Sequence, residues 1–152
     1  MSQTPDRAVC TEWLLELITD RLPVDQKCGD GKPEAPTGQP LKYPYRVVYS
    51  IPGGSINGPP LGQAYGDAVF PYQVDSVGRT RADAEIAGAE VMEWVVGRTA
   101  AGTFVVQAPD PVGVRISDRI MDGTPGAPLQ EGQPPNQVFT VSHTFGLCVT
   151  VG

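Results

Sequence analysis

The sequence predicts an α+β fold in which two helices pack on one mostly antiparallel sheet. Two segments, near residues 5–21 and 80–96, carry apolar residues at three- and four-residue spacing, which is typical of amphipathic helices. Residues 137–151 alternate between apolar and polar side chains, which is typical of a strand with one buried face. With two strands between the helices and two or three after them, we expect a single two-layer domain over residues 1–152.

The first helix is predicted from its start signal and its apolar face. Thr4 can cap the helix, Pro5 suits the first helical position, and Asp6 favours the positive end of the helix dipole. Pro23 marks the end. The apolar positions at helical spacing are Cys10, Trp13, Leu14, Leu17, Ile18 and Leu22.

The second helix has its own capping signal. Thr80 followed by Asp83 resembles a capping box with aspartate in place of glutamate, and Gly97 is placed to end the helix. Small residues on one face predict close packing on a sheet. That face consists of Ala84, Ala87, Gly88, Val91 and Val95. Because the apolar faces of the helices and of the sheet must cover one another, we expect Trp13, Leu17, Val91 and Phe145 in the core.

Four further extended segments complete the predicted sheet. Residues 43–51 are rich in aromatic and β-branched side chains, and residues 68–77 alternate, so the two predict an antiparallel pair. Pro71 has no N–H to donate, so we expect an edge position or a bulge there. Residues 103–107 and 112–121 are the next two expected strands.

Glycine and proline, 18 and 16 residues, gather between these segments and predict exposed loops at residues 23–42, 52–66 and 122–136. Because proline restricts a loop, less conformational entropy is lost when the loop docks on a partner. We therefore take the second and third loops as candidate assembly interfaces. The candidate residues are Pro52, Gly53, Gly54, Ser55, Ile56, Pro59, Pro60, Pro125, Leu129, Pro134 and Pro135.

Charge and cysteine content exclude several classes of function. The formal net charge is −6, so a basic surface for sequence-specific nucleic-acid binding is not expected. Cys10, Cys28 and Cys148 match no zinc or disulfide pattern. No apolar run approaches the length of a membrane span, and the first residues lack the pattern of a signal peptide, so we expect a protein of the reducing cytoplasm.

No catalytic constellation emerges from the motifs. His143 lies on the apolar side of the last strand, where a buried, hydrogen-bonded core or interface histidine is the simpler interpretation. Gly53–Gly54 leads into prolines and not into a helix, so it predicts a turn and not a phosphate loop. The carboxylates of the second helix have the spacing of a solvated face. We expect no enzyme activity, no cofactor and no metal.

Four stretches, in this order, resemble a known family. They are Asp6–Val9 leading into Trp13–Leu14, then Tyr49–Ser55, Ser76–Arg81 and Pro134–Phe139. Together they resemble tail terminator proteins of siphophages, the long-tailed viruses with non-contractile tails, particularly those of actinobacteria. The resemblance runs from about residue 4 to residue 151. The loop of residues 25–41, with Cys28, is longer and less patterned than the family leads us to expect, so no role is carried over to it.

The resemblance implies a subunit of a ring, commonly a hexamer, at the head-proximal end of the tail tube. Such a ring stops polymerisation of the tube protein and provides the docking surface for the head-tail connector. It would be assembled in the host cytoplasm and reside in the virion.

Two alternatives stay open. One is another neck protein, such as a head-completion or connector subunit. The other is a small hydrolase or ligand-binding domain, which a deep polar pocket around His143 would favour.

DNA would pass through such a ring, and the charge of the chain bears on that passage. An acidic bore repels the phosphates of DNA and lets the genome slide. Four carboxylates are candidates for lining it: Asp110, Asp118, Asp122 and Glu131. An acidic exterior that serves only solubility explains the same charge.

Overall fold

The computed structural model describes residues 5–23, 26–35, 37–52, 55–57, 67–123 and 125–151. The strands of this part form one seven-stranded mixed sheet. Its main path runs β1 (Gly29–Asp30), β2 (Tyr45–Ser50), β4 (Asp67–Gly78), β7 (Val138–Val151) and β5 (Val114–Met121). Two short strands lie off this path: β3 (Ser55–Asn57) pairs with β4, and β6 (Leu129–Glu131) pairs with β7. The α+β prediction is confirmed.

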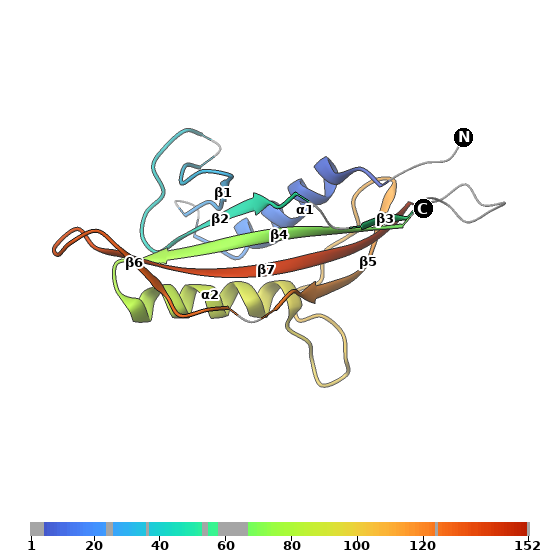
Figure 1. Ribbon diagram of the computed structural model, residues 1–152. Coiled ribbons are helices and arrows are strands. Elements are labelled where there is room, and N and C mark those ends of the chain that lie inside the picture. The colour runs from blue at the N-terminus through green and yellow to red at the C-terminus, as the bar shows by residue number, and fades with distance from the viewer. Residues whose placement is uncertain are drawn as a thin grey trace.

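The pairings show that the sheet is mostly antiparallel. Only β1 and β2 run parallel among the described strands, over two residue pairs. The longest ladder joins β4 to β7 without interruption, from the pair Asp67–Thr150 to the pair Gly78–Phe139. These two strands run side by side along the length of the molecule (Figure 1). The predicted pairing of residues 43–51 with 68–77 is also confirmed, in β2 and β4.

Both helices cover the same face of this sheet. The pairs Tyr72–Phe145 and Val74–His143 stand side by side on β4 and β7, so these four side chains share one face. Helix α2 (Arg81–Val96) meets that face at His143, which an added Cβ at Gly88 would touch. Helix α1 (Arg7–Thr19) lies on the same side, because Tyr72 donates to or accepts from Thr11 at 2.9 Å.

The core lies between the helices and this face. Trp13, Leu17, Val91 and Phe145 are all buried, so the predicted core is confirmed. It also contains residues of β2, β4 and β7 that alternate inward. These are Val48, Phe70, Tyr72, Val74, Leu147 and Val149.

The ends of the helices differ in how well the sequence predicted them. Thr80 caps α2 by accepting from the backbone N–H of Asp83 at 3.1 Å, as expected, and Gly97 ends the helix. The cap of α1 is Asp6, which accepts from the N–H of Ala8 at 2.9 Å. The predicted cap, Thr4, lies outside the described residues, and Pro5 precedes the helix. The prediction was therefore wrong by two residues, because Asp6 is as good a cap as threonine.

The prediction for Pro71 was wrong, since β4 is an inner strand and its ladder with β7 has no bulge there. Proline is tolerated because pairing with β2 ends at Tyr72 and pairing with β3 begins at Val69. Pro71 lies in the gap between those two neighbours. Its carbonyl is used instead, accepting from the N–H of Ile51 at 3.2 Å and from Arg7 Nη2 at 2.7 Å.

Residues 103–107 do not form the expected strand. Only an isolated bridge between Arg98 and Phe104 is present. Within this run Val106 is buried and Val105 is exposed. The Phe104 ring contacts the guanidinium groups of Arg98 and Arg119, at 4.3 and 4.2 Å from its centroid. Conversely, the three predicted loops each contain a short strand: β1, β3 and β6.

Candidate assembly surfaces

The two candidate assembly loops lie at opposite ends of the β4–β7 ladder. Strand β3 pairs with the first residues of β4, and β6 pairs with the first residues of β7, which lie beside the last residues of β4. The hairpin between β6 and β7 projects at one end of the molecule, and β3 lies at the other (Figure 1). The 12 residues of β4 span about 40 Å at ~3.4 Å per residue.

The candidate residues of these loops are exposed where the structure describes them. Pro52, Pro125, Pro134 and Pro135 are exposed, and Leu129 exposes 61% of its surface. Ser55 and Ile56 belong to β3, with only their backbone described. Gly53, Gly54, Pro59 and Pro60 lie outside the described residues. The exposed Leu129 stands on β6, so an apolar side chain is held by the sheet at that end.

His143 is buried on the apolar face, as predicted, but one of its two ring nitrogens lacks the predicted hydrogen bond. Among the described residues, its Nδ1 has no partner. Its ring stacks on Phe145, with centroids 6.1 Å apart, and lies against Gly88 of α2. Burial lowers the pKa of this imidazole below its ordinary value of 6.5. Such close packing leaves no space beside Gly88 for a substrate, so the observation that would favour a hydrolase is missing at this contact.

The cysteines are packed in ways that leave little thiolate. Burial raises the pKa of Cys10 to about 11 and that of Cys28 to about 12. Cys148 is half-buried on the sheet face opposite the helices, where burial first and then Asp118 raise its pKa. In the described part of the chain, no group of three or more His, Cys, Asp or Glu residues could hold a metal ion.

Three arginines link separate segments of the chain, a role that was not predicted from the sequence. Arg7 donates through Nη2 to the carbonyls of Ile51 and Pro71, at 2.6 and 2.7 Å. Arg119 donates to the carbonyl of Val106 at 2.8 Å. Arg46 is buried and donates to Glu90 at 2.9 Å, so Glu90 is not simply part of a solvated face.

These arginines also contact aromatic rings. Arg119 lies 4.8 Å from the ring centroid of Trp13, and Arg46 lies 5.4 Å from that of Trp94. Burial lowers the pKa of both guanidinium groups, which nevertheless keep their charge because an arginine pKa begins so high. For Arg46 the available signal was the alternation of β2, in which it shares the inward side with Val48. For Arg119 there was none, because a register shift between Ile116 and Asp118 breaks the alternation of β5.

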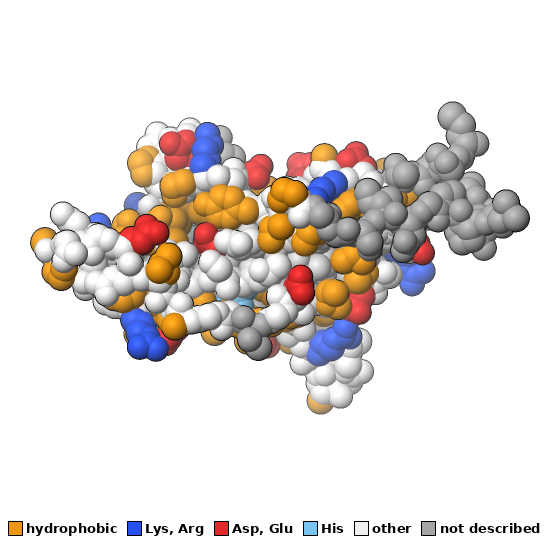
Figure 2. All heavy atoms as spheres, viewed as in Figure 1, with side chains coloured by type: hydrophobic (Ala, Val, Ile, Leu, Met, Phe, Trp, Pro, Cys, Tyr) orange, Lys and Arg blue, Asp and Glu red, His pale blue; other side chains and the backbone are white. Residues whose placement is uncertain are grey.

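The sheet face opposite the helices carries polar residues along the middle of β4 and β7. On it, Asp75 accepts hydrogen bonds from Gln73 Nε2 at 2.8 Å and from Ser142 Oγ at 2.7 Å. Charged side chains are sparse over the middle of the molecule in Figure 2, where β4 and β7 run in Figure 1. Asp75 therefore has a structural role in linking two strands.

The four carboxylates considered for a DNA bore all lie along or beside one edge of the sheet. Asp118 is in β5 and Glu131 is in β6, both of which pair with the same side of β7. Asp122 is exposed and follows β5, and Asp110 accepts from the N–H of Ile116 at 3.2 Å. Asp118 is paired with Arg98 at 2.8 Å, so part of this charge is compensated.

A scan against models of known protein families finds none that matches this chain, and a search of curated proteins finds no significant match. None of the described helices is long and apolar enough to cross a membrane.

Proposed function

We propose that this protein is a tail terminator of a siphophage. It forms a ring, commonly a hexamer in such proteins, that caps the head-proximal end of the tail tube in the virion. There it stops the tube protein from polymerising and offers a docking surface to the head-tail connector. The ring acts by binding alone, without catalysis or a cofactor.

The observation that carries this proposal is the placement of the two candidate loops. A capping ring needs two separate contact surfaces, one for the tube and one for the connector. Strand β3 of the first Gly/Pro-rich segment and strand β6 of the second lie at opposite ends of the longest ladder, which is about 40 Å long. That arrangement supports the resemblance on which the proposal rests.

The distribution of basic side chains is consistent with a ring through which DNA passes. Of the 11 lysines and arginines, Arg46 and Arg119 are buried. Lys32, Arg81 and Arg98 are paired with carboxylates. These five cations are therefore engaged within the chain, and the carboxylates of the β5–β6 edge would repel the phosphates of DNA.

The test is a polymerisation assay with the tube protein of the phage that encodes this chain. Purified protein is added to growing tubes, and tube lengths and ends are measured by electron microscopy. We expect shorter tubes with extra density at one end. Tubes that grow to the same length with bare ends would refute the proposal. Binding to an isolated connector ring but never to tubes would favour another neck protein.

A further inference from the structure

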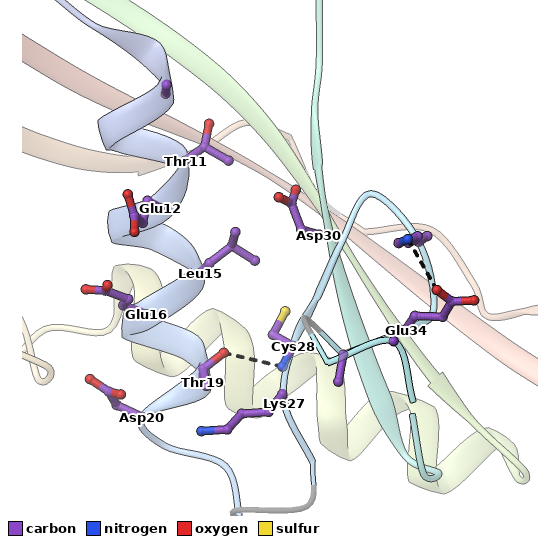
Figure 3. A pocket seen from close by; sticks show the side chains of 14 residues that line it. Thr11, Glu12, Leu15, Glu16, Thr19, Asp20, Lys27, Cys28, Asp30 and Glu34 are labelled. Carbon is purple, nitrogen blue, oxygen red and sulfur yellow. Dashed lines mark hydrogen bonds and ion pairs between the residues drawn. The ribbon is translucent and has the colours of Figure 1, made fainter. Parts of the chain in front are cut away.

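A groove lies between α1 and residues 27–35 and 38, beside the core. Its volume is about 980 Å³, and none of the candidate assembly residues lines it. Thr11, Leu15 and Thr19 stand one helical turn apart and face this groove (Figure 3). Cys28 and Ala35 line it on the other side. Leu15 packs against the core on one side and is only half-buried, so part of its side chain stays accessible in the groove.

The rim of the groove is acidic. Glu12, Glu16 and Asp20 follow the outer side of α1, and Asp30 and Glu34 lie across from them (Figure 3). Beside these five carboxylates, the described lining of the groove contains two lysines, Lys27 and Lys32. Lys32 is paired with Glu34 at 3.2 Å. Among the described residues, no ion pair reaches Glu12, Glu16, Asp20 or Asp30.

The spacing of these carboxylates indicates what would neutralise them. Glu12, Glu16 and Asp20 are four residues apart, or about 6 Å along the helix axis. Like charges at this spacing destabilise a helix slightly. The described carboxylates do not gather into a group that could hold a metal ion. The complementary partner is therefore a row of cations at the same spacing, as a second helix with basic residues at i, i+4 and i+8 provides.

A second copy of this chain does not supply such a helix. Its described helices, α1 and α2, carry one basic residue each, Arg7 and Arg81. Arg7 is bound to backbone carbonyls, and Arg81 is paired with Glu85. The occupant must therefore come from a different protein.

We propose that this groove binds a basic amphipathic helix of a partner protein. Its lysines or arginines lie along Glu12 and Glu16, and its apolar side chains contact Leu15. This recognition follows the helix-in-groove mode, in which apolar anchors and charges are spaced by helical turns. The inference does not depend on the proposed function, since the groove is distinct from both candidate loops.

The test uses a synthetic lysine–leucine helix of about four turns, with lysine at i, i+4 and i+8, as the probe. Binding to the full chain is followed by fluorescence anisotropy at about 50 and about 300 mM salt. We expect saturable binding that weakens as salt rises. The same peptide with glutamate in place of lysine should not bind.

The decisive comparison is between two variants with the same change in net charge. Glu12→Gln combined with Glu16→Gln should weaken binding about two- to thirtyfold, because two surface ion pairs are lost. Glu85→Gln combined with Glu93→Gln removes two exposed carboxylates from α2 and should leave affinity unchanged. Both changes keep good helix formers, so folding is preserved.

Three outcomes would overturn the proposal. They are no binding of the lysine peptide, equal binding of the glutamate peptide, and equal weakening by the two double variants. The last would mean that the peptide responds to net charge and not to the groove. Binding of a free polyamine with the same affinity and the same sensitivity to Glu12 and Glu16 would also overturn it, because no helix is then needed.

Discussion

The contact between Gly88 and His143 makes a quantitative prediction for Gly88→Ala. Alanine is the better helix former by about 1 kcal/mol, so propensity alone predicts a more stable protein. However, the new Cβ would lie 2.8 Å from His143 Cε1 and 3.3 Å from Val141 Cγ1. Both neighbours are buried between helix and sheet. Overpacking of a core costs about 1–3 kcal/mol, so we expect a net loss of up to about 2 kcal/mol.

The assay is urea denaturation of four proteins: the parent, Gly88→Ala, His143→Ala and the double variant. Once the imidazole is removed, the 2.8 Å contact disappears. Gly88→Ala should then stabilise the His143→Ala background by up to about 1 kcal/mol. The coupling energy between these residues is the difference between the effects of Gly88→Ala in the two backgrounds, and we expect the effect to change sign.

A control within the same helix isolates the propensity effect. Ala89 is exposed and adjacent to Gly88, so Ala89→Gly should cost about 1 kcal/mol without any change in packing. The reasoning is refuted if Gly88→Ala raises the stability of the parent protein by about the amount that Ala89→Gly lowers it. That result would mean that α2 has room to move away from the sheet at no cost.

Three further predictions follow from the core and the charge. Burial lowers the pKa of His143 in the folded state, so the unfolded chain binds the proton more readily. The stability that neutral His143 contributes is complete above pH 6.5 and is lost as the pH falls below that value. In urea denaturation at pH 7.5 and 5.5, His143→Phe should therefore reduce the difference in stability between the two pH values. Truncation of buried Trp13 or Phe145 to alanine should cost about 3–5 kcal/mol each, and unchanged melting temperatures would show that the core is misassigned. The purified protein should not retard double-stranded DNA at low salt, and binding that disappears steeply as salt rises would reveal a basic patch that we missed.

Long helices and strands, which repeat their hydrophobic pattern several times, were predictable from the sequence, and strands of two or three residues were not. Strand β7 repeats its alternation often enough to exclude a helix, and each helix has a face of several apolar residues. Strands β1, β3 and β6 have two or three residues each, too few for a pattern to appear. They exist because a neighbouring long strand offers unpaired backbone groups, which is tertiary information.

The incorrect strand at residues 103–107 has a different cause. The run contains phenylalanine and two valines, which normally indicates a strand. In the structure, guanidinium groups cover Phe104, and Arg119 holds the carbonyl of Val106. Composition could not show that a cation from β5 would bind the backbone of this run in place of a neighbouring strand. The groove beside α1 could not be predicted from the sequence either, because residues 27–35, which form its second wall, have no periodic pattern.

The long ladder also bears on how the two candidate loops would work together. Strands β4 and β7 are paired over all 12 residues of β4, and helix α2 packs along both. A paired and covered ladder does not stretch without breaking hydrogen bonds. Surfaces at its two ends are therefore held at a nearly constant separation of about 40 Å. A subunit that contacts one partner at each end would fix the distance between them, and small shifts at one end would reach the other through the same rigid element. For a ring between tube and connector, the length of β4 would then set the height of the joint, so a two-residue deletion in both strands should shorten it by about 7 Å.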